Sequence, residues 1–100
     1  MKGTQCLPVL KALGEETRLR VLQALSEQPL DVSEISERLG VSSYNASKHL
    51  RVLREARLVQ VQRDGKRRVY FVPKRGDQLK VVGDVLDLGC CTFRFTQLSD

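Results

Sequence analysis

The stretch that decides the fold is residues 42–57, which read SSYNASKHLRVLREAR. Wound as an α-helix, with about 100° between successive residues, it places Ala46, Leu50 and Leu53 on one side, which we expect to face the core. The opposite side carries hydrogen-bonding and cationic side chains: Tyr44, Ser47, Lys48 and Arg51. Ser42 is a natural N-cap, and the free N–H groups at such a helix start can bind phosphate. A polar face alone is usually just solvated, so the segments around it decide whether it has an anionic partner.

The segment before this helix predicts a short helix followed by a tight turn. Asp31 and Glu34 stand three residues apart, as in a capping box, so we expect a helix to begin at Asp31. Its buried residues are expected to be Val32, Ile35 and Leu39. Gly40 supplies the left-handed residue that turns the chain. Two helices joined by a glycine turn, the second with a polar outer face, predict a helix-turn-helix over residues 31–57.

Further helices are expected towards the two ends of the chain. Leucines at a spacing of three predict two helices within residues 5–30. A last helix is expected over residues 77–88, because its apolar residues merge into an arc of about half the circumference that includes Val81 and Val85. One subunit cannot bury all of that arc, so we expect a two-fold homodimer, with 5–30 and 77–89 as dimerisation helices. Residues 90–100 are a cysteine-containing tail without clear periodicity.

A β-hairpin is expected over residues 58–73. Apolar and polar residues alternate on both sides of Asp64-Gly65, a dipeptide typical of a type I′ turn. Four cations flank the tip: Arg63, Lys66, Arg67 and Arg68. Because solubility needs only one or two charges, this surplus favours contact with phosphates or a DNA minor groove. We interpret the hairpin as a wing beside the helix-turn-helix.

Charge is concentrated in the middle of the chain. The 100-residue sequence has a net charge of +5, yet residues 38–75 alone contain eleven Lys/Arg and two acidic residues. This asymmetry is typical of nucleic-acid binders, although charge alone does not separate DNA from RNA or an anionic membrane. No apolar run is long enough to span a bilayer and no signal peptide is recognisable, so we expect a cytoplasmic protein without membrane contact. The length predicts a single domain, residues 1–100.

The chain resembles the ArsR/SmtB family of winged-helix repressors. The resemblance rests on four segments: LKALG at 10–14, TRLR at 17–20, SKHLRVLREARLV at 47–59 and the Gly65-Lys66-Arg67 hairpin. It implies a mainly α-helical winged helix-turn-helix with about five helices plus a two-stranded wing, dimeric through its first and last helices. It also implies a repressor that leaves its operator DNA when a metal, metalloid or other inducer binds.

Three positions depart from patterns of this family. Members with a thiolate site on the third helix carry Cys-Val-Cys, where this chain has Asp31-Val32-Ser33. The family's zinc site between the last helices needs paired histidines and carboxylates, but His49 is the only histidine, and we interpret it as structural. Both sites are therefore expected to be absent. Arg57 replaces a glycine common at this helix end, at a cost on the order of 1 kcal/mol if the residue is left-handed.

These features predict a DNA-binding transcriptional repressor and not an enzyme. Two recognition helices of a dimer would enter successive major grooves of double-stranded operator DNA, about 34 to 36 Å apart. Lys48 and Arg51 are the expected base readers, because both suit guanine O6 and N7. The full set of expected DNA contacts is Ser42, Ser43, Tyr44, Ser47, Lys48, Arg51, Arg63, Lys66, Arg67 and Arg68. Two alternative classes are a thiol enzyme and a winged helix used for protein contact. A thiol enzyme is disfavoured because this chain has no second histidine to act as base.

Three cysteines are the expected inducer-binding residues: Cys6, Cys90 and Cys91. A vicinal thiol pair chelates soft ions. Some arsenic-responsive repressors of the family use neighbouring thiolates near the chain's end, so the resemblance favours As(III) as inducer, with Sb(III), Cd and Pb behind it. Trivalent arsenic prefers three thiolates, and in this fold the first helix starts near the end of the last, so Cys6 is expected to join the pair. The alternative is a redox-sensing repressor of the same fold, whose thiols oxidise without metal.

Overall fold

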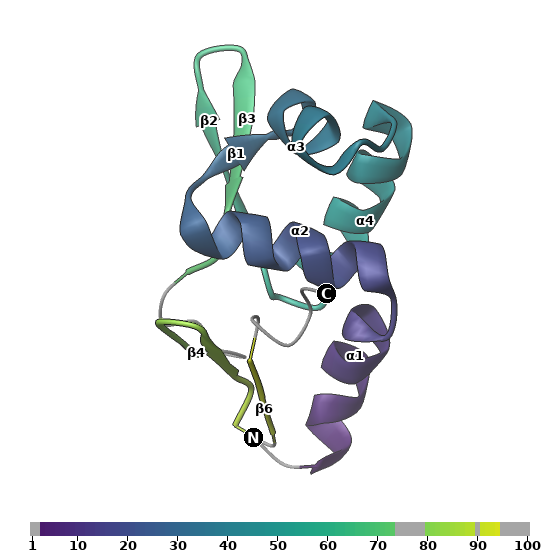
Figure 1. Cartoon of the computed structure of the whole chain (residues 1–100), viewed down its shortest axis with the longest axis vertical. Helices are drawn as coiled ribbons and strands as arrows, with labels where there is room; N and C mark the ends of the chain where they lie inside the picture. The colour runs from purple at the N-terminus through teal and green to yellow at the C-terminus, as the bar shows by residue number, and fades with distance from the viewer. Residues whose placement is uncertain (1–2, 74–79, 90, 95–100) are drawn as a thin grey trace.

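The computed structural model describes residues 3–73, 80–89 and 91–94, with side chains from residue 7 onward. Within these residues the elements follow one another as α1 (Gly3–Leu13), α2 (Glu16–Glu27), β1 (Leu30–Asp31), α3 (Val32–Leu39), α4 (Ser43–Glu55), β2 (Gln60–Asp64), β3 (Arg67–Phe71), β4 (Lys80–Val82), β5 (Val85–Asp87) and β6 (Thr92–Arg94). Figure 1 shows α2 crossing the middle of the molecule, with the β2–β3 hairpin at one end and the β4–β6 sheet at the other. The predicted winged helix-turn-helix is confirmed.

Local side-chain chemistry sets the boundaries of the helix-turn-helix. The Asp31 carboxylate accepts the Glu34 N–H at 2.8 Å, and the Glu34 carboxylate accepts the Asp31 N–H at 2.9 Å, so the predicted capping box is present. Gly40 ends α3 with a φ of 69°. Ser42 caps α4, because its Oγ accepts the N–H of Asn45 at 3.1 Å. These bonds fix where α3 and α4 start, and Gly40 fixes where α3 stops.

The C-terminus of α4 ends in a left-handed arginine. Arg57 has a φ of 63°, and its N–H donates to the Arg54 carbonyl at 3.0 Å. The next N–H, of Leu58, reaches back to the Leu53 carbonyl at 2.9 Å. Together these bonds form a Schellman motif, which usually places glycine at the left-handed position. The left-handed conformation on which the expected cost of Arg57 depends is therefore present.

The wing is a three-stranded antiparallel sheet in the order β1-β3-β2. Sequence reasoning missed β1, a two-residue strand that pairs Leu30 with Tyr70 and Asp31 with Val69. The predicted turn was wrong by one residue: Asp64 pairs with Arg67, so the two-residue loop is Gly65-Lys66. Only Gly65 in this loop has a positive φ, 65°, which excludes a type I′ turn and fits type II′.

The predicted last helix was wrong. Residues 80–82 and 85–87 form β4 and β5, which pair with each other and with β6, while residues 77–79 lie outside the described part. Gly83, with a φ of 57°, opens a two-residue hairpin loop, and the β-branched valines around it favour strands. The inward residues of this sheet, Val81, Leu86 and Phe93, pack on the core. Val81 is therefore not part of a helical arc that faces a partner, and four helices, not five, are described.

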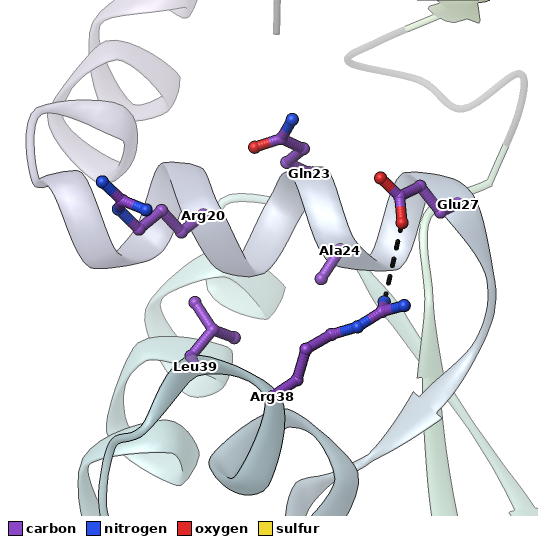
Figure 2. A pocket seen from close by; sticks show the side chains of 6 residues that line it. All are labelled: Arg20, Gln23, Ala24, Glu27, Arg38 and Leu39. Atoms are coloured by element: carbon purple, nitrogen blue, oxygen red, sulfur yellow. Dashed lines mark ion pairs between the residues drawn. The ribbon is translucent and has the colours of Figure 1, made fainter. Parts of the chain in front are cut away.

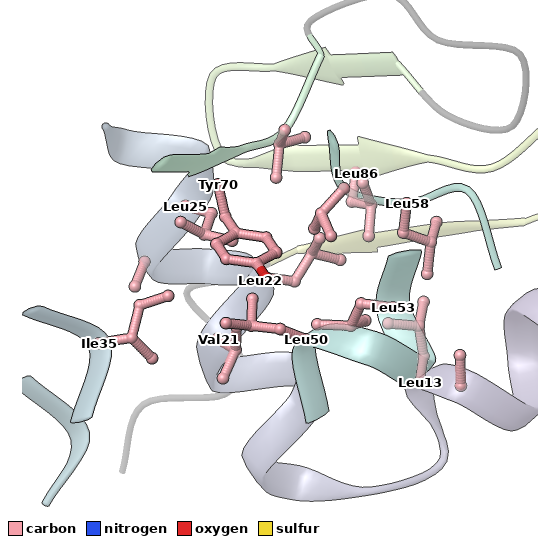
Figure 3. Packing of buried hydrophobic residues seen from close by; sticks show 14 of the residues in the cluster. Leu13, Val21, Leu22, Leu25, Ile35, Leu50, Leu53, Leu58, Tyr70 and Leu86 are labelled. Carbon is pink, nitrogen blue, oxygen red and sulfur yellow. The ribbon is translucent and has the colours of Figure 1, made fainter. Parts of the chain in front are cut away.

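Apolar side chains from both ends of the chain share one core. Leu22, Ile35, Leu50, Leu58 and Leu86 are fully buried, and they come from α2, α3, α4, the segment before β2, and β5 (Figure 3). Ala46 and Leu53 are also buried, so the predicted inner face of α4 is confirmed. No helix within the described residues is long and apolar enough to cross a membrane.

Candidate nucleic-acid interface

The outer face of α4 is a row of exposed polar and cationic side chains. Tyr44 is 72% exposed and the Arg51 side chain 80% exposed, and both lie on the side opposite the buried Leu50. The Lys48 ammonium lies 5.7 Å from the centroid of the Tyr44 ring, close enough for a cation–π contact. The face therefore presents hydrogen-bond donors that match phosphate and guanine acceptors.

A cleft of about 480 Å³ lies between α4 and strand β3. Its lining residues are Ser47, Arg51, Arg54, Glu55, Arg68 and Tyr70. The structure thus joins Arg51 of the helix with Arg68 of the wing, which the sequence had placed on separate elements. Sequence reasoning missed Arg54 and Glu55, although they continue the Ser47 and Arg51 stripe at helical spacing. Glu55 binds Arg51 at 3.0 Å and is the one carboxylate among these lining residues.

The wing divides its cations between two faces. Arg63 and Arg68 are direct cross-strand partners, so both side chains lie on the face that includes Tyr70 and borders the cleft. Two like charges directly opposite each other destabilise a hairpin. A nearby polyanion relieves that repulsion, so this pair favours an anionic partner. Lys66 is exposed in the turn at the tip.

Arg67 points away from this cleft. Side chains alternate along a strand, so Arg67 lies on the opposite face from Arg68. Its Nε lies 3.0 Å from an Asp31 carboxylate oxygen and its Nη2 lies 2.8 Å from a Glu34 oxygen. The hydrogen bond and charge of Asp31, together with Glu34 and Asp64, raise the pKa of Arg67. The guanidinium predicted to contact DNA is thus held at the start of α3.

His49 links α4 to the start of α2. Its Nδ1 lies 3.6 Å from a carboxylate oxygen of Glu15, which caps α2 by accepting the Arg18 N–H at 3.0 Å. Although burial opposes the shift, the N–H groups of Thr17 and Arg18, with His49 adding charge, hold the pKa of Glu15 below its ordinary value. The position of His49 agrees with the structural role expected for it.

A second cavity, of about 350 Å³, lies between α2 and α3 (Figure 2). Its lining residues are Arg20, Gln23, Ala24, Glu27, Arg38 and Leu39. Both arginines are paired with carboxylates, Arg38 with Glu27 at 3.6 Å and Arg20 with Glu16 at 2.8 Å. The cavity therefore adds no uncompensated positive charge to the interface.

The cysteine prediction falls largely outside the described residues. Cys90 and the side chain of Cys6 are not described, and Cys91 is half-buried next to the core. The Leu88 N–H donates to the Cys91 carbonyl at 2.9 Å, which closes the loop between β5 and β6. Among the described residues, no three metal-ligating side chains cluster together.

The fold has counterparts among known proteins. Residues 15–61 match the family described as "Bacterial regulatory protein, arsR family". Reduced HlyU from Vibrio cholerae N16961 has a similar structure, with a TM-score of 0.66 and 33% identity over 69% of this chain and 73% of that one. The chain belongs to the ArsR family. ArsR-family members are transcriptional regulators and not enzymes, as predicted.

Two further proteins are similar to most of this chain. The putative arsenical resistance operon repressor ArsR from Halobacterium salinarum is 43% identical over 75 residues, covering 73% of this chain and 58% of that protein. A homodimeric winged helix-turn-helix DNA-binding domain from Mycobacterium bovis has a TM-score of 0.66 and 32% identity, over 69% of this chain and 64% of that one. The chain spans 44%, 62% and 52% of the length of three curated relatives that it matches.

Proposed function

We propose that this ArsR-family protein is a dimeric transcriptional repressor whose α4 enters the major groove of operator DNA. The observation that carries the proposal is the cleft in which Ser47, Arg51 and Arg54 of the helix meet Arg68 of the wing. Cations from two elements on one surface suit the two sides of a groove, where phosphates lie on either side of the base edges. Lys48 and Arg51 are the proposed base readers. Ser42, Ser43, Tyr44, Ser47, Arg63, Lys66 and Arg68 are the proposed backbone contacts.

The DNA proposal is tested by affinity measured over a range of salt concentrations. Affinity is expected to fall with salt, with a log-log slope of about −0.9 for each phosphate contacted. Lys48→Ala or Arg51→Ala is expected to cost about 1 to 3 kcal/mol of binding free energy and to relax sequence preference. Lys80→Ala is the matched control, because this exposed lysine lies on β4 at the end of the molecule away from the wing (Figure 1). Salt-independent binding, or equal losses from all three variants, contradicts the proposal.

The proposed dimer uses the outer face of α1. Leu7 and Leu10 stand one helical turn apart there and are 50% and 41% exposed. Such apolar exposure on a helix suits a second copy of the chain, and the M. bovis relative is homodimeric. The double variant Leu7→Glu/Leu10→Glu is expected to sediment as a monomer and to lose operator affinity, because each half-site alone is weakly held. A variant that remains dimeric shows that the interface lies elsewhere.

The proposed inducer is trivalent arsenic or a related thiophilic ion bound by Cys90 and Cys91, with Cys6 as third ligand. Support comes from the chemistry of adjacent thiols and from the H. salinarum relative named as an arsenical resistance repressor. Bound ion would supply bonds between the β5–β6 loop and α1. A coupling of about 1 to 3 kcal/mol would weaken DNA binding about 5- to 150-fold. The second candidate is thiol oxidation, favoured by the likeness to a protein solved as reduced HlyU.

Operator release separates the two inducer chemistries. Wild type, Cys6→Ser and Cys90→Ser/Cys91→Ser are each treated with arsenite, zinc, cadmium or peroxide, and the metal arms are run under full reduction. Arsenite is expected to release wild type but not the double variant. Arsenite release from the double variant rejects the cysteine pair. Release by peroxide alone transfers the sensing role to redox chemistry. If arsenite releases Cys6→Ser as fully as wild type, the third ligand of the ion is a group other than these three cysteines.

A further inference from the structure

Arg67, Asp31 and Glu34 form a cluster, here called the wing clasp, that joins two elements far apart in sequence. The arginine lies on β3 near the tip of the wing, 36 and 33 residues from its two partners at the start of α3. Both contacts are short, 3.0 and 2.8 Å, and one guanidinium holds both carboxylates. Ion pairs between charged donors and carboxylates at this length are the stronger hydrogen bonds of proteins.

The two carboxylates are already fixed before the arginine reaches them. Each caps α3, since Asp31 accepts the Glu34 N–H and Glu34 accepts the Asp31 N–H. The same Glu34 oxygen accepts both the Asp31 N–H and the arginine. An exposed ion pair usually loses much of its benefit to the entropy of ordering two flexible side chains. Here only the arginine remains to be ordered, so the wing clasp keeps more of that benefit.

The wing clasp extends the attachment of the wing beyond the last backbone pairing. Strand β1 pairs with β3 only at Tyr70 and Val69. Further towards the tip the wing has two strands, in which Arg63 pairs with Arg68 and Asp64 with Arg67. An isolated two-stranded hairpin is marginally stable in water, and opposed arginines weaken this one further. The contacts of Arg67 with Asp31 and Glu34 tie this section to the start of α3.

We propose that Arg67 is a positioning residue that aims the wing, and not a phosphate ligand. By holding one face of β3 against α3, it turns Arg63 and Arg68 on the other face towards the cleft beside α4. The inference rests on the proposed DNA binding. A positioning role predicts a change in DNA affinity opposite to the change expected from charge alone, because the wing clasp has two carboxylates and one guanidinium. Electrostatics alone says that neutralising those carboxylates strengthens DNA binding, whereas positioning says that it weakens binding.

The decisive variant is Asp31→Asn/Glu34→Gln. Asn is as good an N-cap as Asp, and Gln suits the capping-box position, so α3 keeps its start while the ion pairs are lost. We expect operator affinity to fall about 3- to 10-fold, as for the loss of two modest ion pairs, although the net charge rises by two. Arg67→Gln is expected to give a similar loss, and the triple variant no further loss, because all three residues act through one cluster.

Lys66→Gln is the matched control, because it removes a neighbouring tip cation outside the wing clasp. The salt slope of the control is expected to shrink by about 0.9, the value for one phosphate contact, while that of Arg67→Gln stays at the wild-type value. Amide hydrogen exchange of residues 63–68, measured without DNA, is expected to quicken in the clasp variants only.

Each outcome decides a separate point. A rise in affinity for Asp31→Asn/Glu34→Gln, or a reduced salt slope for Arg67→Gln, overturns the positioning role. Unchanged exchange at the tip in the clasp variants overturns the tie to α3. Absence of salt-dependent DNA binding by wild type refutes the proposed function instead, and the exchange measurement still decides whether the wing clasp orders the wing.

Discussion

Replacing Arg57 with glycine is expected to stabilise the protein. Arg57 has a φ of 63° and is exposed, and no hydrogen bond or ion pair of its side chain is described. A left-handed conformation costs an L-residue about 1 to 2 kcal/mol. Glycine avoids that cost but gives up about 0.4 to 1 kcal/mol because its unfolded chain is more flexible. The backbone bonds of the Schellman motif, at 3.0 and 2.9 Å, do not depend on the side chain.

The comparison that isolates this backbone effect is Arg57→Gly against Arg57→Ala. Alanine also removes the side chain and its charge, but it keeps the left-handed cost. The difference in free energy of unfolding is therefore expected to be about 0.5 to 1 kcal/mol in favour of glycine. For a domain of this size that corresponds to about 2 to 8 °C in melting temperature. Urea or thermal unfolding at one fixed protein concentration measures it, because a dimer's stability depends on concentration.

The neighbouring Ala56 provides a control at the same helix end. Its φ is −81°, so glycine relieves nothing there and is expected to destabilise by about 0.5 to 1 kcal/mol. If Arg57→Gly is no more stable than Arg57→Ala, or if Ala56→Gly stabilises equally, the left-handed strain assigned to Arg57 is refuted. Operator affinity of Arg57→Gly is expected to change little, because Arg57 lies outside the proposed contacts.

Three further outcomes are expected. Glu55→Gln removes a negative charge from the cleft, so affinity for all DNA sequences is expected to rise about 2- to 3-fold at low salt. This magnitude is that of one charge about 8 Å from a phosphate in water, and the gain is expected to vanish at high salt. Leu50→Ala empties a fully buried site and is expected to cost about 2 to 5 kcal/mol in urea unfolding. Acid is expected to destabilise the fold, because the Glu34 N–H, with Arg67, holds the pKa of Asp31 below its ordinary value of 3.8. The ionised Asp31 therefore contributes to the free energy of unfolding above pH 3.8, and this contribution is lost as the pH falls through the lowered pKa. Asp31→Asn should flatten that part of an unfolding curve recorded against pH.

The sequence by itself determined the helix-turn-helix and the polar face of α4. Its boundaries depend on groups no more than five residues apart, such as Asp31 with Glu34 and Ser42 with Asn45. The hydrophobic period then sets which side of α4 is buried, because Leu50 and Leu53 can reach the core only from one side. For Arg57 the sequence supplied only a condition, because the resemblance marks a helix end where glycine is common, and the φ of 63° came from the structure.

The tertiary structure alone decided the second sheet, the turn of the wing and the direction of Arg67. Valines and leucines near Gly83 satisfy either a helical or a strand period, and pairing with β6 settles the choice. The wing turn follows from pairs such as Val61 with Tyr70, whose register is set by burial and not by the turn dipeptide. Arg67 could not be distinguished from the neighbouring cations by sequence, because the sequence does not show in which direction a charged side chain points. Only folding brings it to a carboxylate 36 residues away.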